Sequence, residues 1–359
     1  MIFVSANIRA ADLEDFVGGV SSARITTNPA SVGLINSFHI QYDGAQYDAP
    51  DSTGQTFVSD SEYETGVVTQ GSLIFAMPIE DWFSVGISFS GQFERYDSEV
   101  TLVEEIKRNS KEKITRLTSG FLIGMPFDLF TIGASFNRHD IVTEKEVKFF
   151  NVTTDEADSK FKGSAVLNSV DYGIIIPNIF DIIDFGVTYI PSKEGIIEYD
   201  IKKGSTKIEA TEEFEEPGQV IYGIGYSYDL ESSIFQFLGD VGSITQVKKN
   251  FLGEAGDGGN TKGGLIRYAY PPLLDISYGI REEELASLTI RTETASLQLP
   301  IYIGTIKIGT QRILLLDDEG TVADITIPKF SFNVQFGERV GRALELKPKT
   351  KKITFIDRL

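Results

Sequence analysis

The stretch FSVGISFSGQFE, residues Phe83 to Glu94, decides the fold. Apolar and aromatic side chains alternate in it with Ser, Gly, Gln and Glu. A period of two is that of a β-strand, because successive side chains point to opposite faces of the pleat. One face of this strand therefore carries large apolar side chains, and the other carries small polar ones. Whether the apolar face contacts protein, water or lipid decides the class of protein.

The same alternation returns in segment after segment of the 359-residue chain. Helical periodicity, with apolar residues three or four apart, is nearly absent. The sequence therefore predicts an all-β protein, and the length fits either two or three ordinary domains or one large β structure. The alternating segments include 38–43, 132–137, 185–189, 222–228, 302–308 and 330–336.

The turns between these segments are of two kinds. Short turns that contain proline and acidic residues are expected at 77–81, 125–128, 176–181 and 270–272, because proline cannot donate a hydrogen bond to a strand ladder. Long polar loops are expected at 44–64, 97–112, 202–217 and 253–260. Short turns at one rim and long loops at the other are typical of outer-membrane barrels.

A weak internal repeat sets the number of strands. Segments 77–90, 125–137 and 176–190 each run from a proline and an acidic residue to an aromatic, a glycine and a further alternating stretch. Each repeat corresponds to one long strand pair, and six or seven pairs fit between Leu34 and Phe336. We therefore expect an antiparallel transmembrane β-barrel of about 14 strands, with 12 or 16 as alternatives.

Three features favour a membrane barrel over a soluble sandwich, whose apolar faces would meet in a dry core. The strand from Trp82 to Tyr96 has 15 residues, longer than strands of globular sheets. Aromatic residues gather near the turns, as in the interfacial girdles of membrane proteins. The polar face is rich in Gly and Ser and has few charges. No run of about 18 apolar residues predicts a transmembrane helix, but barrel strands need only about 10 alternating residues.

Composition limits the other classes of function. A net charge of −19 argues against nucleic acid as a partner, and the lack of cysteine excludes disulfides and Cys-based metal sites. His39 and His139 are the two histidines, each near an aspartate in sequence, and a hydrogen-bonded pair explains each more simply than catalysis. His39 is expected to line the lumen. No nucleophile elbow, phosphate loop or zinc spacing is present, so we expect no enzyme, cofactor or metal.

Residues 18–34, GGVSSARITTNPASVGL, resemble the N-terminal plug of the FadL-type long-chain fatty acid transporter family. In that family a stretch of small residues leads to an Asn-Pro-Ala motif just before the first strand. Asn28, Pro29 and Ala30 match the motif, and Ser31-Val32 intrudes before Gly33-Leu34. Residues 217–226 resemble a mid-barrel strand of the family. Related barrels, including the PorV-type subunit of a bacterial secretion machine, share this N-terminal pattern.

The resemblance implies an N-terminal segment over residues 1–33, which forms a plug in the lumen, and a β-barrel over 34–359. Residues 1–6 are either a signal-peptide remnant, since Val4-Ser5-Ala6 resembles the end of an export signal, or an ordinary flexible terminus. In the family, hydrophobic molecules bind inside and leave sideways through a wall opening at a kink in the third strand. Gly86 or Gly91 would supply that kink here.

The function that follows is passive uptake of hydrophobic small molecules, such as long-chain fatty acids or hydrocarbons, by a monomer in the outer membrane of a Gram-negative-type bacterium. Its other partners would be outer-membrane lipid and lipopolysaccharide. One alternative is a non-transporting barrel that serves as an assembly or secretion scaffold, and another is a soluble β-rich adhesin. The end of the barrel also has two solutions: the closing strand precedes the basic tail that follows Phe336, or it is Ile353 to Leu359.

Overall fold

Strands make up nearly all of the chain that the computed structural model describes, which comprises residues 28–35, 38–48, 65–80, 82–101, 107–150, 159–179, 183–203, 206–230, 233–248, 258–270, 273–285, 288–301, 304–317 and 320–336. One short 3-10 helix, η1 (Pro29–Leu34), precedes them. Within these ranges no helix is long and apolar enough to cross a membrane. The predicted all-β fold is confirmed.

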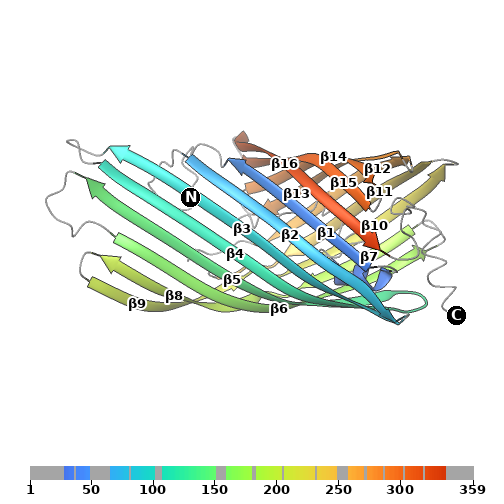
Figure 1. The fold of residues 1–359 in the computed structure, drawn as a ribbon, viewed down its shortest axis with the longest axis horizontal. Helices are drawn as coiled ribbons and strands as arrows, with labels where there is room; N and C mark the ends of the chain where they lie inside the picture. The colour runs from blue at the N-terminus through green and yellow to red at the C-terminus, as the bar shows by residue number, and fades with distance from the viewer. Residues whose placement is uncertain are drawn as a thin grey trace.

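The strands follow one another along the chain and pair antiparallel around one sheet (Figure 1). Their bounds are β1 (Phe38–Asp48), β2 (Thr65–Glu80), β3 (Phe83–Thr101), β4 (Lys107–Pro126), β5 (Thr131–Phe150), β6 (Ser159–Ile179), β7 (Ile183–Ile190), β8 (Lys193–Lys203), β9 (Thr206–Glu216), β10 (Gln219–Leu230), β11 (Ser233–Ile244), β12 (Gly259–Tyr270), β13 (Leu274–Leu285), β14 (Leu288–Ile301), β15 (Gly304–Asp317) and β16 (Gly320–Phe336).

The sheet closes on itself between its first and last strands. One edge of β1 pairs with β2, and the other pairs with β16 in a register that places Phe38 opposite Phe336. The closing strand is therefore 320–336. The other candidate, Ile353 to Leu359, lies outside the described residues.

The 16 strand segments form a ring of 14 strands. β7 and β8 are two halves of one long strand that is interrupted at Pro191 and Ser192, and β9 and β10 are halves of the next, interrupted at Pro217 and Gly218. The two halves keep a common register across the interruption, since Ile190 pairs with Gln219 and Lys193 with Glu216. The predicted strand number is confirmed.

The two faces of the ring differ as the alternation predicts. On β3, Phe89 and Phe93 point outward and are about half exposed, whereas Ser84 and Glu94 point inward and are buried. The same outward apolar surface continues around the ring. A soluble sandwich would bury these side chains between two sheets, and the closed ring leaves them on the outside, among them Phe121, Phe136, Tyr172, Ile224, Phe237, Tyr278 and Ile308.

The wall of the barrel is taller on one side. β3 to β6 have 19 to 21 residues, whereas β10 to β14 have 12 to 14. The long strands and the β8–β9 hairpin project together at the left of Figure 1.

Two loops predicted from the sequence are mostly strand, and this part of the prediction is wrong. Segment 97–112 continues β3 and begins β4, and segment 202–217 holds the end of β8 and all of β9. The high content of charged residues in these two segments is typical of loops, which is why the sequence predicts loops there. In the structure these side chains pair within the sheet, as Lys207 of β9 does with Asp200 of β8 and Glu209, and opposite charges on neighbouring positions suit an exposed antiparallel ribbon.

The outward apolar face yields a prediction for residue Phe89. In phospholipid vesicles, Phe89→Arg should lower the free energy of unfolding by about 2–4 kcal/mol, because a charged side chain replaces an apolar one on the lipid side of a strand. Denaturant titration of the refolded barrel measures the effect. Phe89→Leu is the matched control and should stay close to the parent; an equal loss in both variants would contradict an acyl-chain environment.

Candidate functional site

Residues 28–35, here called the plug segment, lie inside the ring against β4, β5 and β6. The whole Asn28-Pro29-Ala30 motif is buried, as are Ser31 and Val32. The structure thus places the three motif residues together in the lumen. That they act as a movable plug stays a prediction, and the preceding residues 1–27 lie outside the described part of the chain.

The sequence accounts for the local shape of the plug segment. Asn28 has extended backbone angles, φ −122° and ψ 108°, as the residue before a proline favours. Pro29 starts η1, where its missing N–H group is not needed. The Asn28 side-chain oxygen accepts a hydrogen bond from the backbone N–H of Ala30 at 3.0 Å. The backbone carbonyl of Asn28 accepts a second one from the Ser31 hydroxyl at 2.8 Å.

Asn28 also ties the plug segment to the wall. Its side-chain nitrogen donates to the carbonyl oxygens of Ile174 on β6, at 3.3 Å, and Val187 on β7, at 3.2 Å. Ile174 and Val187 are partners in register on neighbouring strands. The amide therefore uses both donors and its acceptor, and it joins three parts of the molecule through one side chain.

A row of three glycines, here called the plug seat, lets the segment approach the wall. Gly124 of β4, Gly133 of β5 and Gly173 of β6 are successive partners in register. A Cβ atom at Gly173 would overlap the Asn28 amide, one at Gly133 the backbone of Pro29 and Ala30, and one at Gly124 the backbone of Gly33. Only glycine permits such a close approach of two backbones.

Sequence reasoning found Gly133 through the repeat but missed its two partners. A usable signal was present. Gly124 and Gly133 flank the short turn at 127–130 symmetrically, so a hairpin register alone places them opposite each other. Gly173 needed the register of the next hairpin as well, which passes through the long connection between β5 and β6.

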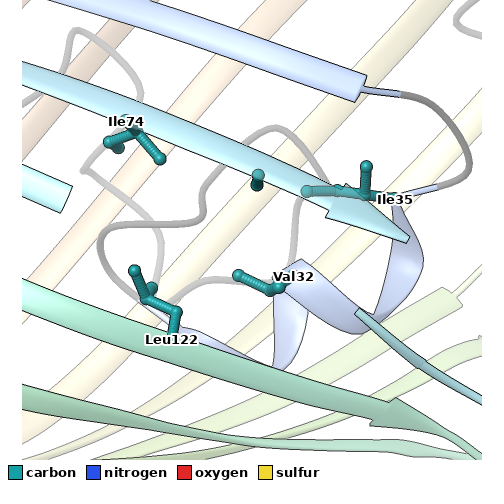
Figure 2. Close-up of a cluster of buried hydrophobic side chains, with 5 residues drawn as sticks. Val32, Ile35, Ile74 and Leu122 are labelled. Atoms are coloured by element: carbon teal, nitrogen blue, oxygen red, sulfur yellow. The ribbon is translucent and has the colours of Figure 1, made fainter. Parts of the chain in front are cut away.

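An apolar cluster holds the other end of the plug segment. Val32 and Ile35 pack with Ile74 and Ala76 of β2 and Leu122 of β4. Figure 2 shows the side chains of Val32, Ile35, Ile74 and Leu122 between η1 and the two strands. Burial of each aliphatic side chain contributes roughly 1.5–3 kcal/mol relative to exposure. The plug segment is thus held by apolar packing on one side and by the Asn28 hydrogen bonds on the other.

The two glycines predicted to kink the third strand lie on opposite faces of β3. Gly86 faces the lumen next to Ala76 and Leu122, and Gly91 lies on the outer face beside Leu117 and Phe93. Pairing with β2 and β4 runs through both positions. An opening at Gly86 or Gly91 stays a prediction about another conformation of the barrel.

The histidines lie on the inner face, in different surroundings. His39 of β1 is 5% exposed and shares its face with Gln41 and Asp43, whose side chains are hydrogen-bonded at 2.7 Å. For His139 the expected pair with a neighbouring aspartate is wrong. Asp140 is adjacent in the strand and therefore points outward, where it pairs with Arg138.

His139 instead joins a polar group in the lumen, with ring nitrogens 2.9 Å from the Thr118 hydroxyl and 3.3 Å from the Ser169 hydroxyl. On the other side of the lumen, Arg267 of β12 forms a buried pair with Asp275 of β13. In the described ranges no group of His, Asp and Glu side chains is arranged to hold a metal ion.

Two apolar clusters lie inside the ring beyond the plug segment. One joins Val68, Ile290, Ile313 and Ile327 near the rim where the long strands project. The other joins Ile141, Ala165, Leu167, Ile197 and Phe214. Leu167 is six residues along β6 from Gly173, roughly 20 Å at about 3.3 Å per residue. A hydrophobic molecule that enters at the rim where the long strands project would therefore contact apolar side chains before it reaches the plug segment.

The plug seat yields a prediction for Gly173. The added methyl group of Gly173→Ala should force the Asn28 amide out of its hydrogen bonds with β6 and β7. Two hydrogen bonds of about 0.5–1.5 kcal/mol each correspond to a rise of roughly fivefold to 150-fold in the undocked population. Maleimide labelling of Ser31→Cys, in a chain without other cysteines, measures that population.

Gly264→Ala is the matched control for this substitution, because a Cβ there meets nothing closer than the Leu238 carbonyl oxygen at 3.7 Å. Labelling of Ser31→Cys at the parent rate is expected in that background. Equal labelling in the two glycine variants would show that the plug seat does not depend on Gly173.

A second prediction separates the two roles of Asn28. Asn28→Asp keeps an oxygen for the Ala30 N–H but loses both donors and places a carboxylate against two carbonyl oxygens. Amide hydrogen exchange of residues 28–35 should accelerate in Asn28→Asp. It should change less in Ser31→Ala, which removes the bond from the Ser31 hydroxyl to the Asn28 carbonyl and keeps the Asn28 amide on β6 and β7. Unchanged exchange in Asn28→Asp would mean that the hydrogen bonds of Asn28 to the wall do not hold the segment.

No family model matches this chain, and no curated protein matches it. Solved structures do. The toluene transporter TbuX from Ralstonia pickettii matches with a TM-score of 0.61 at 12% identity, covering 90% of this chain and 98% of the transporter. The CymD monoaromatic hydrocarbon channel has a TM-score of 0.56 at 11% identity, covering 90% and 94%. A Pseudomonas aeruginosa FadL homologue has a TM-score of 0.57 at 10% identity, covering 89% and 96%.

At these sequence identities, the structural similarity supports the architecture of the chain. It agrees with what the Asn-Pro-Ala motif implied, because the structures that match over nine-tenths of the chain include a FadL homologue and two hydrocarbon transport proteins. The chain therefore has the fold of the FadL-type hydrophobic-compound transporters, a closed 14-strand antiparallel β-barrel.

Proposed function

We propose that the protein is an outer-membrane channel for the passive uptake of hydrophobic small molecules, such as long-chain fatty acids or hydrocarbons. The observation that carries this proposal is the plug segment docked inside a closed ring whose outer face is apolar. A closed sheet that carries aromatic and aliphatic side chains on its outer face requires apolar surroundings. The neighbours named as toluene and monoaromatic hydrocarbon transport proteins add support.

The route begins at the rim where the long strands project. A hydrophobic molecule leaves water there and contacts the cluster of Val68, Ile290, Ile313 and Ile327, because burial of apolar area is favourable. It then reaches the lumen above the plug segment. Movement of residues 28–35 opens the way further, and no covalent step, cofactor or metal takes part.

The two-part division of the chain belongs to the same proposal. Residues 1–33 act as the movable segment and 34–359 as the wall. The plug segment suits this role because it is held by the Asn28 amide on β6 and β7, by apolar packing on β2 and β4 and by close approach to the three glycines of the plug seat. Such contacts can be broken and remade without unfolding the ring.

The setting is the outer membrane, with a monomer as the working unit. The projecting strands carry exposed charges of both signs, including Lys207, Asp200 and Glu209. Charged groups at this rim suit contact with lipopolysaccharide, whose phosphates and bridging cations occupy the outer surface. The belt below them suits acyl chains.

Vesicle uptake tests the proposal. Purified protein in phospholipid vesicles should raise the uptake of toluene and of oleate above that of protein-free vesicles, without an energy source. A disulfide between Val32→Cys and Leu122→Cys would fix the plug segment to β4 and should stop uptake until it is reduced. Native mass spectrometry of the detergent-purified protein should find bound acyl or hydrocarbon species. Failure of uptake together with no bound lipid would favour a secretion scaffold.

A further inference from the structure

The outer face of the long strands β3 to β6 changes from apolar to charged toward the projecting rim. On β3, the exposed ring of Phe93 is followed on the same face by Arg95, and on β4, Leu117 is followed toward the rim by Lys113. The outward charged side chains of residues 95–97, 111–113, 138–148 and 160–162 are here called the basic strip. They lie on the strands that project at the left of Figure 1.

The basic strip is cationic in a protein whose net charge is −19. Among its described side chains, seven are lysine or arginine and four are aspartate or glutamate, which leaves a net charge of +3. Positive charge is therefore concentrated on one sector of an otherwise acidic molecule. Such a local field favours an anionic partner at this place.

Three lysines of the basic strip are free to bind such a partner. Each of the four acidic side chains already pairs with one cation of the strip at 2.9–3.3 Å: Arg95 with Asp97, Arg138 with Asp140, Lys148 with Glu146 and Lys162 with Glu144. Lys111, Lys113 and Lys160 are exposed, and they form no ion pair or hydrogen bond with the residues that the structure describes. Their ammonium groups are thus available to a ligand.

The sheet register brings two of these lysines close to a third cation. Lys111 and Lys113 lie two residues apart on one face of β4, about 6.6 Å at about 3.3 Å per residue. Lys113 is the register partner of Arg95 on β3, and like charges directly opposite each other destabilise a sheet. An anion bound between these side chains would remove the repulsion.

A second pair of like charges lies at the other edge of the basic strip. Lys160 of β6 is the register partner of Lys202 of β8, which is also exposed and without an ion pair in the described chain. Lys160 and Lys111 both pair in register with Glu146 of β5, so two strand spacings of about 4.8 Å separate them. The wall thus offers two cationic positions roughly 10 Å apart along the sheet.

The ligand that fits this surface has anionic and apolar parts. Lysine binds phosphate as a point charge, and a cluster of basic residues beside a membrane surface attracts anionic lipid headgroups. Phe93, Leu117 and Val166 are about half exposed on the same outer face, toward the short-turn rim from the lysines. Acyl chains attached to a phosphorylated headgroup would lie against these side chains. Two phosphate groups on one headgroup would contact both cationic positions.

We propose that the basic strip binds the lipid anchor of lipopolysaccharide, a glucosamine disaccharide that carries two phosphate groups and several acyl chains. Lys111 and Lys113 hold one phosphate group. Lys160 and Lys202 hold the other. This assignment rests on the outer-membrane setting of the proposed function, and it narrows the lipopolysaccharide contact from the whole rim to one sector of the wall. The bound lipid is a partner of the outer wall and is distinct from the transported cargo.

Lipid binding to the purified protein tests the site. Native mass spectrometry measures the affinity for diphosphorylated lipid A in detergent, with a chelator present so that divalent cations do not bridge phosphate to the carboxylates. In the double variant Lys111→Gln, Lys113→Gln the affinity should fall roughly 25-fold, about fivefold for each lysine beside an anionic headgroup. Lys160→Gln should weaken binding about fivefold. The charge-conserving double variant Lys111→Arg, Lys113→Arg should stay close to the parent.

The matched control removes two lysines elsewhere. Lys203→Gln with Lys248→Gln changes the net charge by the same amount at exposed positions off the strip, since Lys203 points to the opposite face of β8 from Lys202 and Lys248 follows β11. Parent affinity is expected there. An equal loss in the two lysine-to-glutamine double variants would overturn the assignment, and so would parent affinity in Lys111→Gln, Lys113→Gln.

A ligand series separates the phosphate groups from the acyl chains and from free phosphate. Monophosphorylated lipid A should bind more weakly than the diphosphorylated form, and phosphatidylethanolamine should bind more weakly still. Inorganic phosphate in excess should not displace lipid A. Displacement by inorganic phosphate would show a site for the free anion, and equal affinity for phosphatidylethanolamine would show binding through acyl chains alone; either result would overturn the assignment.

Uptake measurements keep this site apart from the proposed function. Uptake of toluene and oleate into phosphatidylcholine vesicles should be the same for the parent and for Lys111→Gln, Lys113→Gln, because the route through the lumen does not include the basic strip. Absence of uptake in the parent would refute the proposed function, while the lipid A affinities would still decide the binding site. Loss of uptake in the double variant with unchanged lipid A affinity would assign these lysines to cargo entry and overturn the lipid site.

Discussion

Closure of the backbone ladder between β1 and β16 is the constraint on which the rest of the structure depends. In an apolar medium each unpaired N–H or C=O group is costly, so only a sheet without edges can stand there. Pairing of Phe38 with Phe336 completes the ring and leaves two surfaces that cannot exchange roles. The alternation along each strand then assigns aromatic and aliphatic groups to one surface and small polar groups to the other, and a shift of one residue would reverse both.

A closed ring creates an interior that must be filled, and the glycines of the plug seat determine how. Gly124, Gly133 and Gly173 remove three side chains in a row and make room for a backbone segment at contact distance. The segment brings its own polar groups into the lumen, so it needs partners there. Asn28 meets this need with one amide, which satisfies its own helix start and two wall carbonyls at once. The same contacts thus fill the lumen and anchor the plug segment.

The sequence alone predicted the features that depend on local order. Alternation at Phe83 to Glu94 predicted both faces of β3, the repeat predicted the number of strands, and the Asn28 motif predicted the segment found in the lumen. Features that depend on register between distant segments were out of reach. Pro191 and Pro217 lie at one height only because the β8–β9 hairpin aligns them, and Lys193 meets His139 across three strands. The sequence predicts loops for the charged strands near Lys207, because exposed ribbons and loops share a composition.

The energetics of the ladder oppose a parting of the wall. A backbone hydrogen bond in an apolar medium is worth about 4–6 kcal/mol, so opening a fully paired seam over several residues would need far more than the binding of a small hydrophobic molecule returns. Where β6 changes its partner from β7 to β8, the side chains of Lys193, His139 and Ser169 contact one another on the lumen side of the wall. The plug segment, in contrast, is bound to the wall through side-chain hydrogen bonds and apolar packing. Its movement would therefore break fewer backbone pairs than a parting of the wall.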